Sequence, residues 1–326
     1  MSKKVRWGIL GLGNIANKFA QDLKLSKNAT LVSVASRDLQ KAQAFGRKYN
    51  AAWCFDSYEA LADDPNLDII YIATPHVFHF ENTLMCLRKG KAVLCEKPIS
   101  MNAEEVVILT EEAKARNLFL MEAMWTRFIP ATEKLLSMVR QNEIGEIKHI
   151  NANFGFASDM DPNGRLLDKS LGGGSLLDVG IYPVFLSILL LGVPLNVQAT
   201  ARMTKTDVDS YCAMLFDYEN GAKACLESSI ESDTPTEARI YGEKGTIIVH
   251  SRFHHAEKLT LSTDGKSKSF DINYIGHGYF HEIEEANKCV LNKRTESTKF
   301  PPCESLKLAS LLDLVRANIG LSYEHS

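Results

Sequence analysis

The chain has 326 residues, a length that favours two domains over one. Hydrophobic residues make up 45% of it and charged residues 24%, as in an ordinary soluble globular protein. The formal net charge of -3 excludes bulk electrostatic attraction to nucleic acid or to an anionic membrane. We therefore expect no nucleic-acid partner and no membrane partner.

The seven cysteines are widely spaced and form no C-x-x-C pair. Most lie in apolar surroundings, which predicts free thiols in a reducing compartment and no metal site. The first residues lack the apolar core of a signal peptide, and the longest apolar stretch, Val184–Leu191, is too short to span a bilayer. These features predict a cytoplasmic protein without a bound metal.

A glycine-rich turn follows the first predicted strand, residues 5–10. It is Gly11-Leu12-Gly13-Asn14-Ile15-Ala16, and it precedes a predicted helix that runs to about residue 25. The G-x-G-x-x-A pattern between a strand and a helix is typical of dinucleotide binding, because the glycines let the backbone approach a pyrophosphate at the helix N-terminus. We predict that Gly11, Gly13, Asn14 and Ile15 bind a cofactor. The alternative is a glycine-rich turn without a ligand.

The second predicted strand, residues 31–35, ends in Ser36-Arg37-Asp38. An arginine at this strand end suits the 2′-phosphate of NADP, whereas an acidic residue suits the ribose of NAD. We assign Ser36 and Arg37 to the cofactor, with Asp38 as the N-cap of the next helix. This predicts NADP, with NAD possible if Arg37 is only a solvated residue and Asp38 holds the ribose.

Strands and helices continue to alternate up to residue 121. Further strands are predicted near residue 53 and over 68–73, 91–95 and 118–121, with helices from residue 57 and over 78–88 and 103–116. Units of this length predict a doubly wound parallel sheet of the Rossmann type. Thr74, Pro75 and His76 follow one of these strands, so we assign them and His79 to the cofactor side of the sheet. A structural role is the alternative for both histidines.

Glu96-Lys97-Pro98 follows the strand over residues 91–95. Ligands of open parallel sheets bind outside the carboxyl ends of the strands, so we assign all three residues to the cofactor site. Pro98 restricts Lys97 to extended conformations. The amine of Lys97 can then donate a hydrogen bond to a reacting oxygen, whereas a surface lysine in a turn is the alternative.

The pattern changes after residue 121. A dense aromatic and charged crossover, Trp125-Thr126-Arg127-Phe128, precedes a helix that starts at Pro130. Farther along, Gly172-Gly173-Gly174 leads to a predicted helix on which Asp178 and Tyr182 are four residues apart and share one face. A structural alternative has Asp178 capping a loop and Tyr182 packing in the core.

From residue 196 to about residue 271 the chain is a run of predicted antiparallel hairpins, followed by helices near 279–291 and 305–319. The fold class is therefore α/β: an N-terminal Rossmann sheet plus a C-terminal α/β domain with a largely antiparallel open sheet. We place a dinucleotide-binding domain at residues 1–122. Residues 123–326 form a substrate-binding and oligomerisation domain, with the helix over 305–319 a candidate to pack back on the first. The exposed face of the second sheet predicts a homodimer.

These stretches resemble the family of glucose–fructose oxidoreductase and inositol 2-dehydrogenase (Gfo/Idh/MocA), over essentially the whole chain. The shared motifs are the Gly-x-Gly-x-x-Ala turn, Ala73-Thr74-Pro75 followed by His79, Glu96-Lys97-Pro98, and the triple glycine leading to Asp178 and Tyr182. Within the family, residues 121–128 and 176–182 resemble the branch of the dimeric dihydrodiol dehydrogenases, which are also NADP-dependent D-xylose 1-dehydrogenases.

The resemblance implies a sugar-like or cyclic-diol substrate held between the two domains. It implies that Lys97 is the catalytic lysine and Asp178 the substrate-site aspartate. Tyr182 matches a position that holds histidine in many members and tyrosine in the dihydrodiol branch. Trp125 and Arg127 match residues near the substrate pocket, and a cis peptide bond is expected at Lys97–Pro98.

We hypothesise reversible hydride transfer between nicotinamide and a carbinol carbon, with Tyr182 as general acid and base. Lys97 is the cation beside it, and Asp178 holds a second hydroxyl or orients Lys97. Two alternatives stay open: a non-catalytic NADP-sensing regulatory protein, and a reductase of keto-sugars or linear tetrapyrroles with the same fold.

Overall fold

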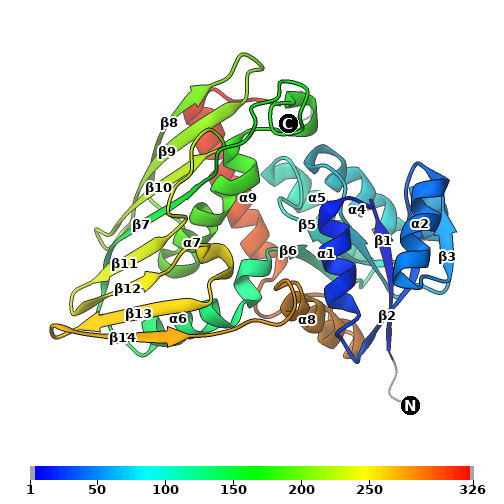
Figure 1. The fold of residues 1–326 in the computed structure, drawn as a ribbon, viewed down its shortest axis with the longest axis horizontal. Coiled ribbons are helices and arrows are strands. Elements are labelled where there is room, and N and C mark those ends of the chain that lie inside the picture. Colours follow the sequence, from blue (N-terminus) through cyan, green and yellow to red (C-terminus); the bar gives the residue numbers. More distant parts are fainter. Residues whose placement is uncertain (1–3, 324–326) are drawn as a thin grey trace. The chain divides into compact units, whose positions relative to one another are not determined.

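A computed structural model of the protein describes residues 4–323. The chain divides into two compact units, each built on its own sheet (Figure 1). Unit 1 comprises Met1–Phe128 and Tyr274–Leu306, and unit 2 comprises Ile129–Asn273 and Lys307–Ser326. The division differs from the one predicted at residues 122 and 123, because a late segment of the chain returns to unit 1.

The sheet of unit 1 has six strands in the order β3-β2-β1-β4-β5-β6, and every neighbouring pair is parallel. Its strands are β1 (Val5–Leu10), β2 (Ala29–Ala35), β3 (Trp53–Phe55), β4 (Ile69–Ile72), β5 (Ala92–Glu96) and β6 (Leu120–Ala123). The central strands β4 and β5 are almost continuously apolar and buried, as expected when helices cover both faces of a parallel sheet. The predicted Rossmann sheet is confirmed.

The helices of unit 1 alternate with its strands in the chain. They are α1 (Asn14–Leu23), α2 (Leu39–Tyr49), α3 (Tyr58–Asp63), α4 (His79–Arg88), α5 (Ala103–Ala115) and α8 (Phe280–Leu291). Two short 3₁₀ turns, His76–Phe78 and Trp125–Phe128, lie after β4 and β6. Contacts join α3, α4 and α5 in series, and α8 packs against α1 and β1.

Two buried hydrogen-bonding groups explain why α8 returns to unit 1. The fully buried Trp7 of β1 donates its indole N–H to the side-chain oxygen of Asn287, at 2.9 Å. Asp22 of α1 accepts the backbone N–H groups of His277 and Phe280, at 2.8 and 3.1 Å, where α8 begins. A buried carboxylate near a helix N-terminus satisfies N–H groups that have no partner inside the helix. The helix therefore completes the core of unit 1.

The sheet of unit 2 has eight strands in the order β14-β13-β12-β11-β7-β10-β9-β8. They are β7 (Ile147–Gly155), β8 (Asn196–Met203), β9 (Asp209–Asp217), β10 (Lys223–Ser229), β11 (Ala238–Gly242), β12 (Gly245–Val249), β13 (Lys258–Thr263) and β14 (Lys266–Asp271). Only the pair β7 and β10 is parallel among these strands of the described chain. The predicted antiparallel character is confirmed, and β7 lies between two hairpin systems.

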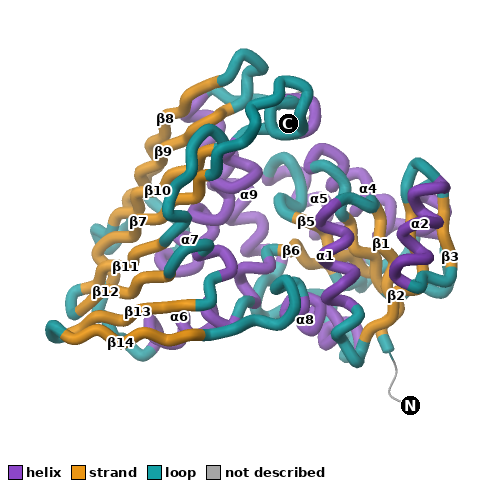
Figure 2. The backbone as a smooth tube through the Cα atoms, in the orientation of Figure 1, coloured by secondary structure: helices purple, strands orange, loops and turns teal. Residues whose placement is uncertain are grey.

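Helices lie against one face of this sheet, and its other face is bare in Figures 1 and 2. The helices are α6 (Pro130–Arg140), α7 (Ile181–Leu191) and α9 (Pro302–Ile319), whose first turn belongs to unit 1. In α7 all residues of 181–188 are buried. The longer segment Lys169–Leu191 could cross a membrane by length and composition, but 78% of its apolar window is buried, as in a core helix.

Candidate active site

The glycine-rich turn of unit 1 has the geometry that a bound pyrophosphate needs. Gly11 has φ +86°, and a Cβ there would lie 2.8 Å from the carbonyl oxygen of Ala73. Only glycine tolerates both conditions. A Cβ at Gly13 would meet no atom within 4 Å, so the space above the turn is open. No side chain of residues 4–323 caps the following α1, which leaves its first N–H groups for a phosphate.

Asn14 and Ile15, also assigned to the cofactor, are exposed at the start of α1. Side chains cap the N-termini of three other helices in this unit: Asp38 for α2, Ser57 for α3 and Asn102 for α5. The N-terminus of α4 also lacks a side-chain cap, so the feature that distinguishes α1 is its position after the open glycine-rich turn.

The end of β2 agrees with the assignments made there. Asp38 accepts the N–H groups of Gln40 and Lys41, at 2.8 and 3.2 Å, which confirms it as the N-cap of α2. Ser36 is buried and Arg37 is exposed. Arg37 hydrogen-bonds the hydroxyl of Tyr58; burial raises the pKa of Tyr58 and the guanidinium opposes that rise. A held, exposed guanidinium suits a phosphate ligand.

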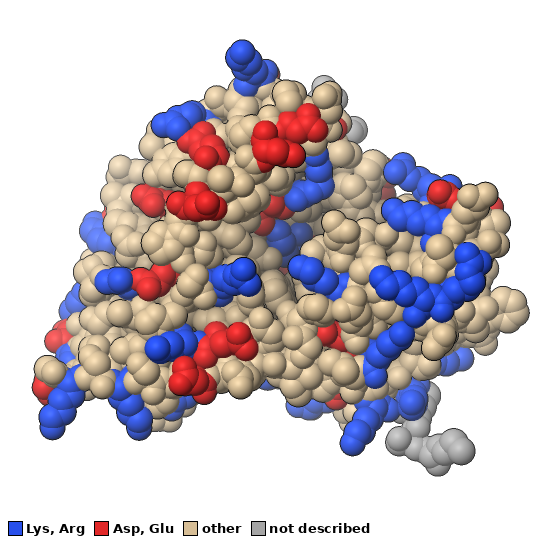
Figure 3. Space-filling view, in the orientation of Figure 1, with Lys and Arg blue, Asp and Glu red and all other residues tan. Residues whose placement is uncertain are grey.

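Basic side chains gather over α1 and α2, as Figure 3 shows. The exposed cations on these two helices are Lys18, Lys24, Lys41, Arg47 and Lys48. Their summed field favours a polyanionic dinucleotide near this part of unit 1.

The segment after β4 is held together by His79. This histidine is fully buried, and its two ring nitrogens face the carbonyl oxygens of Thr74 and Pro98, at 2.8 and 2.6 Å. Burial lowers the pKa of His79, which the two carbonyl contacts oppose. His79 therefore joins the loops that follow β4 and β5. His76 is also buried, and its ring centroid lies 5.8 Å from that of His79.

Lys97 follows β5 directly, and its backbone is fixed by a neighbour. The carboxylate of Glu96 accepts the N–H of Lys97 at 3.2 Å, and the hydroxyl of Tyr71 hydrogen-bonds the other carboxylate oxygen. The peptide bond between Lys97 and Pro98 is cis, as expected. The side chain of Lys97 is partly exposed at the carboxyl end of the parallel sheet. This is the edge where open parallel sheets bind ligands.

A second buried carboxyl group also binds the loop that carries Lys97. Glu122 of β6 accepts the N–H of Ile99 at 3.0 Å and is only 2% exposed. Burial raises the pKa of Glu122 to about 7, and its hydrogen bonds to Ser305 and Ile99 oppose the rise. Burial also raises the pKa of Glu96, which Tyr71 and Lys97 oppose. The loop that carries Lys97 is thus bound by two acids whose pKa values burial raises.

A third buried acid, Glu282 of α8, lies near this cluster. It is fully buried, and neither carboxyl oxygen has a hydrogen-bond partner within residues 4–323. Burial raises its pKa well above the ordinary value, and the charges of Glu96 and Asp22 add to the rise. Burial without a hydrogen-bond partner therefore favours the protonated form of Glu282.

Trp125 and Arg127 lie in the 3₁₀ turn after β6 and are each 9% exposed. The Trp125 ring stacks on Tyr279, with centroids 4.7 Å apart and planes 6° from parallel. Arg127 donates its Nε–H to the carbonyl oxygen of Lys299 at 3.0 Å. The structure thus gives Arg127 a partner within unit 1 that explains its burial.

In unit 2 the triple glycine leads into a π-helical turn, Leu176–Gly180, which continues as α7. The predicted helix is present, but its first turn is π-helical, so Asp178 and Tyr182 are not related by the four-residue bonding of an α-helix. Asp178 lies within this turn and Tyr182 in the first turn of α7. π turns of this kind are frequent at functional sites.

Asp178 has an ion partner that the sequence analysis missed. A guanidinium nitrogen of Arg165 lies 2.8 Å from a carboxylate oxygen of Asp178, with the two side chains 42% and 15% exposed. Arg165 belongs to the long loop that joins β7 to the triple glycine. That loop carries no motif, so only the tertiary structure reveals the pair.

Tyr182 is 6% exposed and lies among aromatic rings of unit 2. Its ring centroid is 4.8 Å from that of His254 and 5.6 Å from that of Phe154, and the latter two rings stack at 4.4 Å. These rings come from three separate elements, so their spacing in the chain carried no signal. Tyr182 packs against the rings of Phe154 and His254.

Comparisons with known proteins agree with this architecture. Residues 5–124 match the oxidoreductase family with an NAD-binding Rossmann fold, and residues 132–248 match the Gfo/Idh/MocA C-terminal domain. The chain belongs to the Gfo/Idh/MocA oxidoreductase family. The predicted resemblance is thereby confirmed, and the family member described here is an NAD(P)-binding oxidoreductase that acts on CH–OH groups.

Two relatives show how close the likeness is within the family. The oxidoreductase is 36% identical over 330 residues to trans-1,2-dihydrobenzene-1,2-diol dehydrogenase of Xenopus tropicalis, across 98% of this chain and 99% of the relative. It is 37% identical over 331 residues to the Mus musculus enzyme of the same name, across 98% of each. Among solved structures it resembles KijD10, a 3-ketoreductase from Actinomadura kijaniata, in complex with NADP and TDP-benzene. The TM-score is 0.88 and the identity 26%, across 97% of this chain and 98% of that one.

Proposed function

We propose that the protein is an NADP-dependent dehydrogenase that moves a hydride between nicotinamide and a carbinol carbon of a sugar, polyol or cyclic diol. The observation that carries the proposal is the presentation of Lys97. An amine stands partly exposed beyond the carboxyl end of β5, on a loop that Glu96, Glu122 and His79 hold by buried hydrogen bonds. The names of the relatives, dihydrodiol dehydrogenases and a ketoreductase, support the substrate class.

When bound, NADP supplies the hydride acceptor and NADPH the donor. The protein's own residues then handle one proton. In the oxidative direction Tyr182 Oη takes the proton of the reacting hydroxyl, and in the reductive direction it returns that proton to the carbonyl oxygen. Lys97 stabilises negative charge on the substrate oxygen. Asp178, oriented by Arg165, accepts a hydrogen bond from a second substrate hydroxyl.

Aromatic surfaces support a cyclic substrate. Trp125 lies flat on Tyr279 in unit 1, and Tyr182 lies beside Phe154 and His254 in unit 2. Flat rings bind the apolar faces of sugars and cyclic diols, while polar side chains such as Asp178 fix the hydroxyl groups.

The assay that tests the function is turnover on aldoses, inositols, dihydrodiols and keto-sugars, with NADP and with NADPH. We expect turnover on at least one member of the panel in at least one direction. The likeness to a 3-ketoreductase makes the reductive direction as informative as the oxidative one. Tight NADPH binding without turnover on any compound would favour a cofactor-sensing regulatory protein instead.

We propose that Arg37 selects NADP over NAD. Arg37→Ala should raise the Michaelis constant for NADP about tenfold or more and leave that for NAD nearly unchanged, because the guanidinium pairs only with the 2′-phosphate. Steady-state kinetics with both cofactors measure the ratio. Arg88→Ala, which changes an exposed arginine in the last turn of α4, is the matched control. Equal effects of Arg37→Ala on both cofactors would contradict the assignment.

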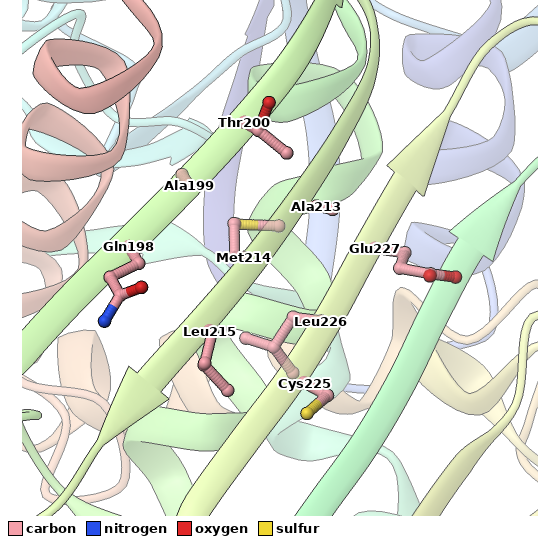
Figure 4. Close-up of a pocket in the computed structure, with 9 residues that line it drawn as sticks. All are labelled: Gln198, Ala199, Thr200, Ala213, Met214, Leu215, Cys225, Leu226 and Glu227. Carbon is pink, nitrogen blue, oxygen red and sulfur yellow. The ribbon is translucent and has the colours of Figure 1, made fainter.

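We also propose that the bare face of the unit 2 sheet binds a second copy of the chain. A hollow of about 350 Å³ lies over β8, β9 and β10, shown in Figure 4. It is lined by Gln198, Ala199, Thr200, Ala213, Met214, Leu215, Cys225, Leu226 and Glu227. The charges around it come in opposite pairs, Lys223 with Asp217 and Arg202 with Glu231. Such a nearly neutral face with exposed apolar side chains suits an identical copy of itself.

Leu215→Arg should convert the dimer to a monomer. Leu215 is exposed in the centre of the hollow's lining, so a dimer across this face would bury an unpaired charge there. Light scattering coupled to size exclusion measures the mass. Leu314→Arg adds the same charge to an exposed leucine of α9 and should leave the mass unchanged. A wild-type monomer, or a Leu215→Arg dimer, would rule out this interface.

We further propose a cytoplasmic location, which the seven free cysteines support.

A further inference from the structure

A buried carboxylate lies directly under the turn that carries Asp178. Asp209 opens β9 and is fully buried. One of its carboxylate oxygens accepts the hydroxyl of Ser175 at 2.6 Å and the backbone N–H of Leu176 at 2.7 Å. Leu176 is the first residue of the π turn. Asp209 therefore caps this turn from another strand, since no side chain of the turn's own N-cap does so.

The chain is shaped to admit this carboxylate. A Cβ at Gly174 would lie 2.3 Å from an oxygen of Asp209, and Gly174 has φ +110°. A Cβ at Gly180 would lie 2.9 Å from the hydroxyl of Ser228, and that hydroxyl hydrogen-bonds Ser175 at 2.9 Å. Glycines at both ends of the π turn thus let Asp209 and Ser228 approach the backbone.

The C-terminal segment reinforces the same turn. Tyr323 donates its hydroxyl to the carbonyl oxygen of Gly173 at 2.6 Å, and the guanidinium of Arg316 lies over the Tyr323 ring at 5.6 Å. The triple glycine, a flexible sequence by itself, is therefore tied on two sides. Asp178 is two residues beyond the capped Leu176, and α7 with Tyr182 follows without a break.

We infer that Asp209 is a positioning residue, which sets the π turn and thereby the places of Asp178 and Tyr182 relative to substrate. The inference rests on the proposed function of those two residues. Asp209 itself acts through the backbone of Leu176 and the hydroxyl of Ser175, and it touches no reacting atom. Misplacement of reacting groups by about 1 Å lowers turnover by about 10²-fold, so a small shift of the turn has a large kinetic effect.

The ionisation of Asp209 should affect turnover and the stability of the fold in opposite directions. Burial raises the pKa of Asp209 to about 6, and its bonds to Ser175 and Leu176 oppose the rise. Other titratable or charged groups around it are Cys212 on the same strand and Tyr323, with Arg316 behind the latter. Because the pKa of Asp209 is higher in the folded than in the unfolded protein, its protonated form stabilises the fold at low pH, and this stabilisation is lost as the pH rises through about 6. At neutral pH the charged carboxylate therefore lowers the free energy of unfolding.

Asp209→Asn tests the inference, because it keeps the shape and removes the charge. We expect kcat to fall about tenfold or more at neutral pH, with the NADP Michaelis constant unchanged and the thermal midpoint equal to or above that of wild type. Hydrogen exchange should quicken in residues 176–182. The acid limb of the wild-type pH–rate profile, near the pKa of Asp209, should vanish in Asp209→Asn. Asp207→Asn, in the exposed turn before β9, should match wild type in all five measurements.

Ser175→Ala is the second variant, since it removes one donor and leaves the carboxylate in place. Ser175→Ala should lower kcat less than Asp209→Asn does, and it should also quicken hydrogen exchange in residues 176–182. It keeps the inference testable if Asp209→Asn folds poorly. Unchanged kcat or unchanged exchange over residues 176–182 in these variants overturns the positioning role. Absence of turnover in wild type would instead overturn the proposed function, and the exchange measurement would still decide whether Asp209 holds the turn.

Discussion

Lys97→Ala should lower turnover by about 10²–10⁴-fold and leave NADPH binding nearly intact. General acid–base and electrostatic contributions from one side chain have this size. The loop backbone around residue 97 is held by the carboxylates of Glu96 and Glu122, which bind the N–H groups of Lys97 and Ile99. Removal of the Lys97 side chain therefore leaves the loop in place. Steady-state kinetics give turnover, and quenching of tryptophan fluorescence gives NADPH affinity.

Lys89→Ala is the matched control, because Lys89 lies just before β5 and pairs with Asp63 on the surface. Its kinetics should match wild type. Tyr182→Phe should reduce turnover by a similar factor to Lys97→Ala, and the double variant by little more than either, as expected for groups that act as a unit. Unchanged turnover in Lys97→Ala with a good substrate would show that the assigned role is wrong.

Glu282→Gln should gain stability relative to wild type as the pH rises from mildly acidic to neutral. Glu282 is fully buried, and neither carboxyl oxygen has a hydrogen-bond partner among the described residues. Its pKa is raised well above 4.5 by burial and by the charges of Glu96 and Asp22. Glutamine has the same shape and no proton to lose. It therefore keeps the packing of α8 and removes the ionisation.

The direction of the pH effect on stability follows from the number of protons bound to the folded and unfolded protein. Between the unfolded and folded pKa values, native Glu282 keeps a proton that the unfolded chain has released, so wild-type stability falls as pH rises, by about 1.4 kcal/mol per pH unit. The stability gain of Glu282→Gln should therefore be small near about pH 5 and large near about pH 7. Urea unfolding at several pH values measures it. All three tryptophans, Trp7, Trp53 and Trp125, lie in unit 1, so fluorescence follows the unit that contains Glu282.

Glu111→Gln replaces an exposed glutamate of α5 and serves as the comparison. Its stability difference from wild type should stay constant across the pH range. A Glu282→Gln variant whose stability difference is equally flat would show that Glu282 is ionised in the folded protein, with a partner that pairs its charge. The prediction concerns stability alone, so activity of the variant does not enter the test.

The parallel sheet of unit 1 was predictable because its signals are local. Each strand is a short apolar run, and the helices α2, α3 and α5 each begin at a side chain that caps them, such as Asp38 and Asn102. The alternation of both elements then leaves one topology for a doubly wound sheet. The return of α8 to this unit was not predictable. It depends on the hydrogen bond from Trp7 to Asn287, which are 280 residues apart.

Some residues of the candidate site were predictable from local motifs, and others were not. Gly11, Arg37 and Lys97 lie in short motifs at strand ends, so the sequence identifies them without knowledge of packing. Arg165 and Asp209 carry no motif, because their roles come from contacts with a turn that is distant in the chain. The π turn itself was taken for an α-helix, since helical periodicity in so short a segment does not distinguish four-residue from five-residue bonding.

The amino-acid sequence alone identifies the class of protein, an NAD(P)-binding oxidoreductase of the Gfo/Idh/MocA family. Motif residues and local periodicity are enough for that, because they depend on neighbours in the chain. The fold, by contrast, shows which buried acids hold the Lys97 loop, which arginine pairs with Asp178 and which carboxylate caps its turn. Those contacts join residues far apart in sequence, and burial changes the ionisation of each acid in a way that depends on the whole fold.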